Sequence, residues 1–152
     1  MDVRARYGRV IPIQLSVIGG GYVGLVSSVC LAELGHQVNL VEIDEEKVKA
    51  INSGAPPIYE KGLKEMLTAH AGNRLTATDS YDCIPDTDIT FICVGTPPDS
   101  EGRADLSMLR SASISIGVAL MGADGYHIVV VKSTVPPGTT GDLVAAEVLD
   151  HS

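Results

Sequence analysis

Hydrophobic positions along the chain follow two patterns that alternate from one segment to the next. Short, continuous apolar runs are typical of strands buried on both faces of a parallel sheet, whereas apolar residues three and four positions apart are typical of helices. The continuous runs predict strands at 15–19, 37–44, 74–79, 88–95 and 127–134, the third being the least apolar. The spaced segments predict helices at 22–34, 45–53, 63–70, 106–120 and 142–149.

This alternation of strands and helices predicts a fold class. Strands separated by helices form right-handed βαβ crossovers, which give a parallel sheet covered on both faces. We therefore expect an α/β protein with a doubly wound parallel sheet, a Rossmann-like dinucleotide-binding domain. Ligands of such sheets bind beyond the carboxyl ends of the strands. The segments at that edge are 19–24, 42–47, 95–98 and 133–138.

The first of these segments, "GGGYVG", contains the pattern G-x-G-x-x-G at Gly19, Gly21 and Gly24, with Gly20 in the first variable slot. In such a turn the first glycine permits a tight bend and the second lets a diphosphate approach bare backbone. The third lets helix and strand pack closely. The diphosphate then meets the unpaired N–H groups at the start of the helix. The alternative is a glycine-rich turn without a ligand, which the preceding strand and the following helix disfavour.

An acidic residue at the end of the second strand is expected to accept hydrogen bonds from an adenosine ribose. Glu42 lies 18 residues beyond Gly24 and Asp44 lies 20 beyond it, so the spacing leaves both open. An acid here repels the additional phosphate of NADP and favours NAD. Lys47 is either a contact to ribose or phosphate oxygens or a solvated helix lysine, and each acid could also be an ordinary solvated residue.

Two later loops resemble each other. "ICVGTPP" and "VVKSTVPPGT" each consist of a strand, small hydroxyl residues and a proline pair. The prolines stop the strands and stiffen the backbone, while Thr96, Ser133 and Thr134 offer short hydroxyl groups. We expect both loops at the same edge as the glycine turn, where a nicotinamide and its ribose would extend. Simple strand termination is the alternative reading of either loop alone.

Composition and charge exclude several classes of protein. A chain of 152 residues with 45% hydrophobic content fits one domain with an ordinary core. The formal net charge of −8 argues against a nucleic-acid partner, which needs a basic face. No apolar run reaches the roughly 18 residues that predict a membrane span.

The cysteines and the first residues add little chemistry. Cys30, Cys83 and Cys93 form no CxxC pair, so we expect no metal site. Their odd number favours reduced thiols in a cytoplasmic protein. Residues 1–14 lack the apolar stretch of a secretory signal and are interpreted as a short arm or an expression remnant. We place the domain at 15–152.

Five motifs together resemble the UDP-glucose/GDP-mannose dehydrogenase family, and its UDP-glucose 6-dehydrogenase branch in particular. The resemblance runs from about residue 15 to the end, through "GGGYVGLV", "VEIDEEKVKAINSGAPPIYEKGL", "CVGTPP", "GRADLS" and "VKSTVPPGT". It implies an oxidoreductase that uses two NAD molecules to convert the C6 alcohol of UDP-glucose to the carboxylate of UDP-glucuronate through a cysteine adduct. It also implies a homo-oligomeric full enzyme of nucleotide-sugar metabolism and polysaccharide biosynthesis.

The resemblance also assigns individual residues. It selects Glu42 rather than Asp44 for the ribose, makes Lys47 a basic cofactor contact, and places the Thr134 hydroxyl near the reacting centre as the one catalytic candidate. The residues expected to bind the cofactor are Gly19, Gly20, Gly21, Tyr22, Val23, Gly24, Glu42, Lys47, Val94, Gly95, Thr96, Pro97, Pro98, Ser133, Thr134 and Val135.

The chain also departs from the family pattern. Lys61 stands where the family usually has proline, and we expect it to loosen that loop. The sequence ends before the family's later acidic motif, its catalytic lysine and asparagine, its nucleophilic cysteine, the linking helix and the sugar-binding domain. We therefore expect the chain to bind NAD without turning over UDP-glucose. The alternatives are the dinucleotide domain of another oxidoreductase family, such as a 2-hydroxyacid or phosphogluconate dehydrogenase, and a nonenzymatic NAD-binding module.

Overall fold

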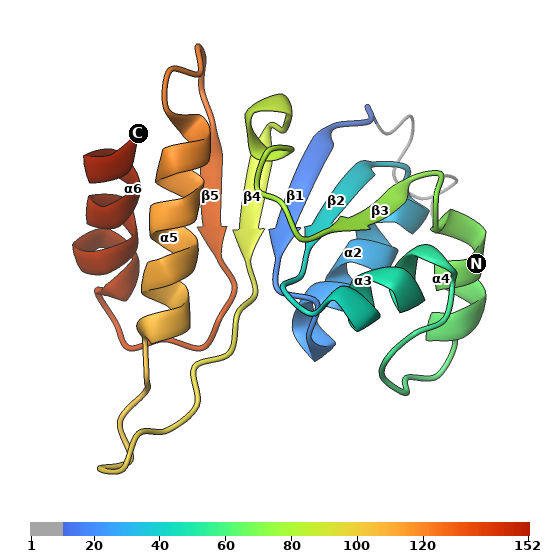
Figure 1. Cartoon of the computed structure of the whole chain (residues 1–152), viewed down its shortest axis with the longest axis horizontal. Helices are drawn as coiled ribbons and strands as arrows, with labels where there is room; N and C mark the ends of the chain where they lie inside the picture. The colour runs from blue at the N-terminus through green and yellow to red at the C-terminus, as the bar shows by residue number, and fades with distance from the viewer. Residues whose placement is uncertain (1–10) are drawn as a thin grey trace.

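The computed structural model describes residues 11–152, so residues 1–10 of the expected N-terminal arm lie outside the described residues. A parallel sheet crosses the molecule in the order β3-β2-β1-β4-β5, which confirms the doubly wound fold (Figure 1). Each predicted strand is present, though several are shorter than expected. The strands are β1 (Gln14–Ile18), β2 (Gln37–Val41), β3 (Leu75–Thr78), β4 (Ile89–Ile92) and β5 (Ile128–Val131).

Helices cover both faces of the sheet and connect its strands, except that only a short 3₁₀ turn lies between β3 and β4. In Figure 1, α5 and α6 lie side by side next to β5, and α2, α3 and α4 gather around the other end of the sheet. Each helix lies within or overlaps a segment that the sequence predicts to be helical. The helices are α2 (Tyr22–Leu34), α3 (Glu45–Asn52), α4 (Leu63–His70), α5 (Ser107–Leu120) and α6 (Ala146–His151).

Two hydrophobic clusters form because side chains alternate between the faces of each strand. Leu15 and Val17 of β1 belong to the cluster under α2, α3 and α4, whereas Ile18 belongs to the cluster under α5. All three side chains are at most 2% exposed. The cluster under α5 is completed by Val41, Ile84, Ile92, Leu109, Ala112, Ile116 and Val144. The central strand β1 is therefore buried on both faces, as its apolar sequence predicts, whereas the edge strand β5 has no fully buried residue.

The last helix differs from its prediction. It was expected at 142–149, but the chain winds into a π-helical segment, η2 (Thr140–Ala145), before α6. The left-handed Gly138 (φ 91°) precedes this segment, and its carbonyl accepts from the N–H of Asp142 at 2.9 Å. A short 3₁₀ turn, η1 (Ile84–Asp86), also precedes β4. Hydrophobic periodicity does not distinguish these tighter and wider turns from α-helix.

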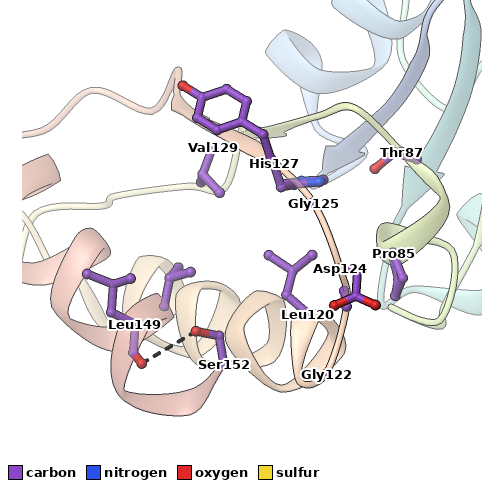
Figure 2. A pocket seen from close by; sticks show the side chains of 13 residues that line it. Pro85, Thr87, Leu120, Gly122, Asp124, Gly125, His127, Val129, Leu149 and Ser152 are labelled. Atoms are coloured by element: carbon purple, nitrogen blue, oxygen red, sulfur yellow. Dashed lines mark hydrogen bonds between the residues drawn. The ribbon is translucent and has the colours of Figure 1, made fainter.

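A buried polar chain crosses the sheet near the amino ends of the strands. Ser16 of β1 and Thr90 of β4 are register partners with hydroxyl oxygens 2.6 Å apart, and both residues are fully buried. The Thr90 hydroxyl also lies 2.7 Å from Nε2 of His127. His127 borders a hollow of about 410 Å³ at the amino ends of β4 and β5, together with Thr87 and Asp124 (Figure 2). This hollow lies at the edge of the sheet opposite to the predicted site.

This arrangement predicts a pH-dependent stability. Burial lowers the pKa of His127 from its usual 6.5, while the Thr87 carbonyl and the Asp88 carboxylate oppose the shift more weakly. Below the pKa that His127 has in the unfolded chain, the unfolded chain binds the proton more readily than the folded chain does. The contribution of His127 to stability is therefore lost as pH falls from about 6.5 towards its pKa in the folded chain. We expect the wild-type melting temperature to drop more steeply between about pH 7.5 and about pH 5.5 than that of His127→Gln. Parallel profiles of the two proteins would contradict this.

Candidate functional site

The glycine turn lies where the strand order reverses. β1 stands between β2 and β4: the chain continues from β1 to β2 and β3 on one side, and then crosses back to β4 and β5 on the other. In an open α/β sheet the crevice at such a switch point is the usual ligand position. The N–H of Gly19 donates to the carbonyl of Val41 at 2.8 Å, and a Cβ at Gly19 would lie 2.9 Å from the Cys93 carbonyl oxygen. The turn is thus fixed between the ends of β2 and β4.

The other glycines of the pattern differ in their surroundings. Gly21, the residue before α2, is exposed, and a Cβ added there would meet nothing within 4 Å. Within residues 11–152 no side chain caps the first N–H groups of α2, which leaves them open to an anion in this part of the chain. A Cβ at Gly24 would overlap the carbonyl oxygen of Gly19. Gly21 therefore leaves space for a ligand, and Gly24 permits close packing of α2 on β1.

Gly20 does more than fill a variable slot. Its N–H donates to Oε2 of Glu42 at 2.9 Å, and the N–H of Asp44 donates to Oε1 of the same carboxylate at 3.0 Å. Glu42 is only 7% exposed. The G-x-G-x-x-G pattern leaves position 20 variable, so it contains no signal that Glu42 at a neighbouring strand end occupies this space.

The two candidate acids have separate structural roles. Asp44 caps α3 by accepting from the N–H groups of Glu46 and Lys47 at 3.0 and 3.2 Å. Glu42 instead lies against the glycine turn, with Nζ of Lys47 3.8 Å from its carboxylate. Glu42 and Lys47 therefore stand together beside the turn, while the Asp44 carboxylate is engaged by the helix.

The two similar loops meet at the same edge, as expected. The Thr96 hydroxyl donates to the backbone carbonyl of Thr134 at 2.7 Å, and the Ser133 hydroxyl donates to the carbonyl of Val94 at 2.7 Å. We call this reciprocal pair of hydrogen bonds the loop latch. Two of the three predicted hydroxyl donors are thus engaged by the protein itself. The exposed Thr134 hydroxyl takes part in no side-chain hydrogen bond within residues 11–152.

The loop at 54–62 is tied to the start of α2. The Tyr22 hydroxyl donates to the Glu60 carboxylate, and this contact raises the pKa of Tyr22. The following Lys61 donates its backbone N–H to Glu60 at 3.1 Å. The expectation that Lys61 loosens this loop stays a prediction, and Tyr22 and Val23 both lie exposed at the first turn of α2.

Two further findings concern metal ligands and membrane-spanning helices in the described residues. Within 11–152, no group of three or more His, Cys, Asp or Glu side chains could hold a metal ion. No helix in this part of the chain is long and apolar enough to cross a membrane. The candidate site consists of the backbone N–H groups of the glycine turn, the Glu42 carboxylate, Lys47 and the two loops joined by the loop latch.

A parallel sheet with a glycine turn at its switch point and an acid at the next strand end defines a dinucleotide-binding domain. Comparison with known proteins gives the family. Residues 13–152 match the UDP-glucose/GDP-mannose dehydrogenase family, NAD binding domain, and the chain belongs to this family. The match excludes the alternative of another oxidoreductase family.

Individual relatives support the same assignment. The UDP-glucose 6-dehydrogenase AglM of Haloferax volcanii is 46% identical over 92% of this chain and 33% of its own length. A UDP-glucose dehydrogenase structure from Pyrobaculum islandicum aligns with a TM-score of 0.89 and 43% identity, over 95% of this chain and 35% of that one. A ternary complex of GDP-mannose dehydrogenase from Pseudomonas aeruginosa aligns with a TM-score of 0.88 and 38% identity, over 91% and 32%. The chain spans about a third of the length of these relatives.

Proposed function

We propose that this domain binds NAD across the carboxyl ends of its strands, with the diphosphate at residues 19–24 and the adenosine ribose at Glu42. The observation that carries the proposal is the Glu42 carboxylate, which is 7% exposed and oriented by two backbone N–H groups beside the exposed turn. A carboxylate has about four lone-pair positions. Two remain for the ribose hydroxyls, and Lys47 is close enough to contact the same ribose or the diphosphate.

The nicotinamide end is proposed to extend along the latched loops, residues 94–98 and 133–135. When bound, NAD supplies a hydride acceptor to the reaction. We propose that Thr134 positions a water or a substrate hydroxyl there, because its exposed hydroxyl is too weak an acid or base to act alone. Thr96 keeps the Thr134 backbone in place through the latch.

For the enzyme as a whole we propose oxidation of the C6 alcohol of UDP-glucose to UDP-glucuronate by two NAD, in a cytoplasmic homo-oligomer. The names of the relatives support a nucleotide-sugar substrate and include both UDP-glucose and GDP-mannose. Burial raises the pKa of Cys93 to about 11, which makes it unsuitable as the nucleophile. Separately, we expect the 152-residue chain to bind NAD and to form no NADH from UDP-glucose.

A matched pair of variants tests the cofactor site. Glu42→Gln and Asp44→Asn each replace one carboxylate by an amide of the same size at neighbouring positions. We expect Glu42→Gln to weaken NAD binding about tenfold, because the ribose loses charge-assisted hydrogen bonds. It should also narrow the preference for NAD over NADP, because the charge that repels the additional phosphate is gone. Isothermal titration calorimetry with both cofactors measures these effects.

Asp44→Asn is the control for this pair. Asparagine still caps α3, so NAD affinity should stay close to that of the wild type. Equal losses of NAD affinity in the two variants would indicate that the ribose contacts both Glu42 and Asp44. No NAD binding by the wild-type chain would overturn the proposed function, and NADH formation from added UDP-glucose would overturn the expected lack of turnover.

A further inference from the structure

We propose that Gly20 is a positioning residue for Glu42: its missing side chain makes room for a glutamate, rather than a shorter acid, at the end of β2. The inference rests on the proposed NAD site and concerns how that site selects its acid. Its basis is the juxtaposition of the Gly20 backbone and the Glu42 side chain.

The backbone conformation of Gly20 does not require glycine. The φ angle of Gly20 is not positive, whereas its neighbour Gly19 has a φ of 101°. A side chain at position 20 is therefore allowed by the local backbone. Any obstacle to a side chain at this position therefore lies in the surrounding space.

That space is occupied by Glu42. A Cβ added to Gly20 would lie 2.8 Å from Oε2 of Glu42 and 3.2 Å from both Cβ and Cγ of the same side chain. A rotation of the carboxylate alone would relieve only the first contact, since the other two involve atoms close to the backbone of β2. An alanine at position 20 therefore displaces the Glu42 carboxylate and also requires its Cβ and Cγ to shift by a few tenths of an ångström.

Displacement has a chemical consequence. The carboxylate is now fixed by the N–H of Gly20 at 2.9 Å and the N–H of Asp44 at 3.0 Å. An alanine would push Oε2 away from the first of these donors and leave a backbone N–H without its acceptor. The lone pairs that face the ribose would move with it. An aspartate at position 42 would keep its Cβ and Cγ near the added methyl group but would have no atom at the position of Oε2, which makes the tightest contact, so the sizes of residues 20 and 42 are linked.

A double-mutant cycle of Gly20→Ala, Glu42→Asp and the double variant tests this linkage by NAD titration calorimetry. We expect Gly20→Ala to bind NAD about tenfold more weakly, and Glu42→Asp to lose several-fold because its carboxylate no longer reaches the Gly20 N–H. The double variant should bind NAD no more weakly than Glu42→Asp alone, and therefore far better than the product of the two single effects predicts. Gly141→Ala is the control, since its added Cβ meets nothing within 4 Å.

The outcomes separate this inference from the proposed function. If the wild type binds NAD and Gly20→Ala binds equally well, or if the two single effects multiply, the positioning role of Gly20 is overturned and the NAD site stands. If the wild type does not bind NAD, the proposed function fails and the inference fails with it. If Gly20→Ala does not fold, thermal melting decides: recovery of the melting temperature in the double variant supports the linkage, and no recovery overturns it.

Discussion

Gly24→Ala is expected to destabilise the domain by about 3 kcal/mol or more, which is a large part of the stability of an ordinary domain. The added Cβ would overlap the carbonyl oxygen of Gly19 and would lie 3.0 Å from its carbonyl carbon and 3.2 Å from Cβ of Cys93. The nearest atoms are backbone, so no side-chain rotation relieves the overlap. Helix α2 would have to move away from β1. Urea denaturation followed by circular dichroism gives the free energy of unfolding.

The matched control is Gly21→Ala in the same turn. Its Cβ meets nothing within 4 Å and its φ is −72°, so alanine fits there without strain. We expect its free energy of unfolding to stay within about 0.5 kcal/mol of the wild type. Similar losses at Gly21 and Gly24 would show that the close packing of α2 on β1 does not depend on the third glycine of the pattern.

Gly21→Val is expected to abolish NAD binding while the domain stays folded. The branched side chain would stand over the uncapped N–H groups of α2, where the diphosphate is proposed to bind. Loss of those hydrogen bonds and of the close approach should weaken binding by about a hundredfold or more. Calorimetry measures the affinity, and thermal melting verifies the fold.

The outcome distinguishes two positions for the cofactor. A valine variant that keeps both its melting temperature and its NAD affinity would place the diphosphate away from the glycine turn. Gly141→Ala serves again as a control, because its added Cβ would meet no atom of another part of the described chain within 4 Å.

The fold could be predicted closely where local signals coincide with tertiary packing. Helix α2 begins and ends at the expected residues because Gly21 stands before it and Gly35, with a φ of 107°, provides a left-handed cap. The apolar runs predicted both cores because parallel strands are buried on both faces. The π-helical segment at the start of the last helix was not predicted, since its apolar positions are compatible with several helical windings.

The candidate site could be predicted only in part. The sequence identifies the glycine turn and two acids, but their spacing leaves Glu42 and Asp44 equivalent. Their difference arises in three dimensions, where one carboxylate lies against Gly20 and the other caps α3. The buried contact between Ser16 and Thr90 likewise depends on strand register, which single-sequence patterns do not determine.

The loop latch has a consequence for the thermodynamics of ligand binding. Thr96 and Ser133 each hold the backbone of the opposite loop, across 38 and 39 positions of the chain. The two loops are thereby ordered before any ligand binds. Binding therefore does not incur the loss of conformational entropy that ordering these loops would otherwise cost. Preorganisation of this kind strengthens affinity without adding a single ligand contact.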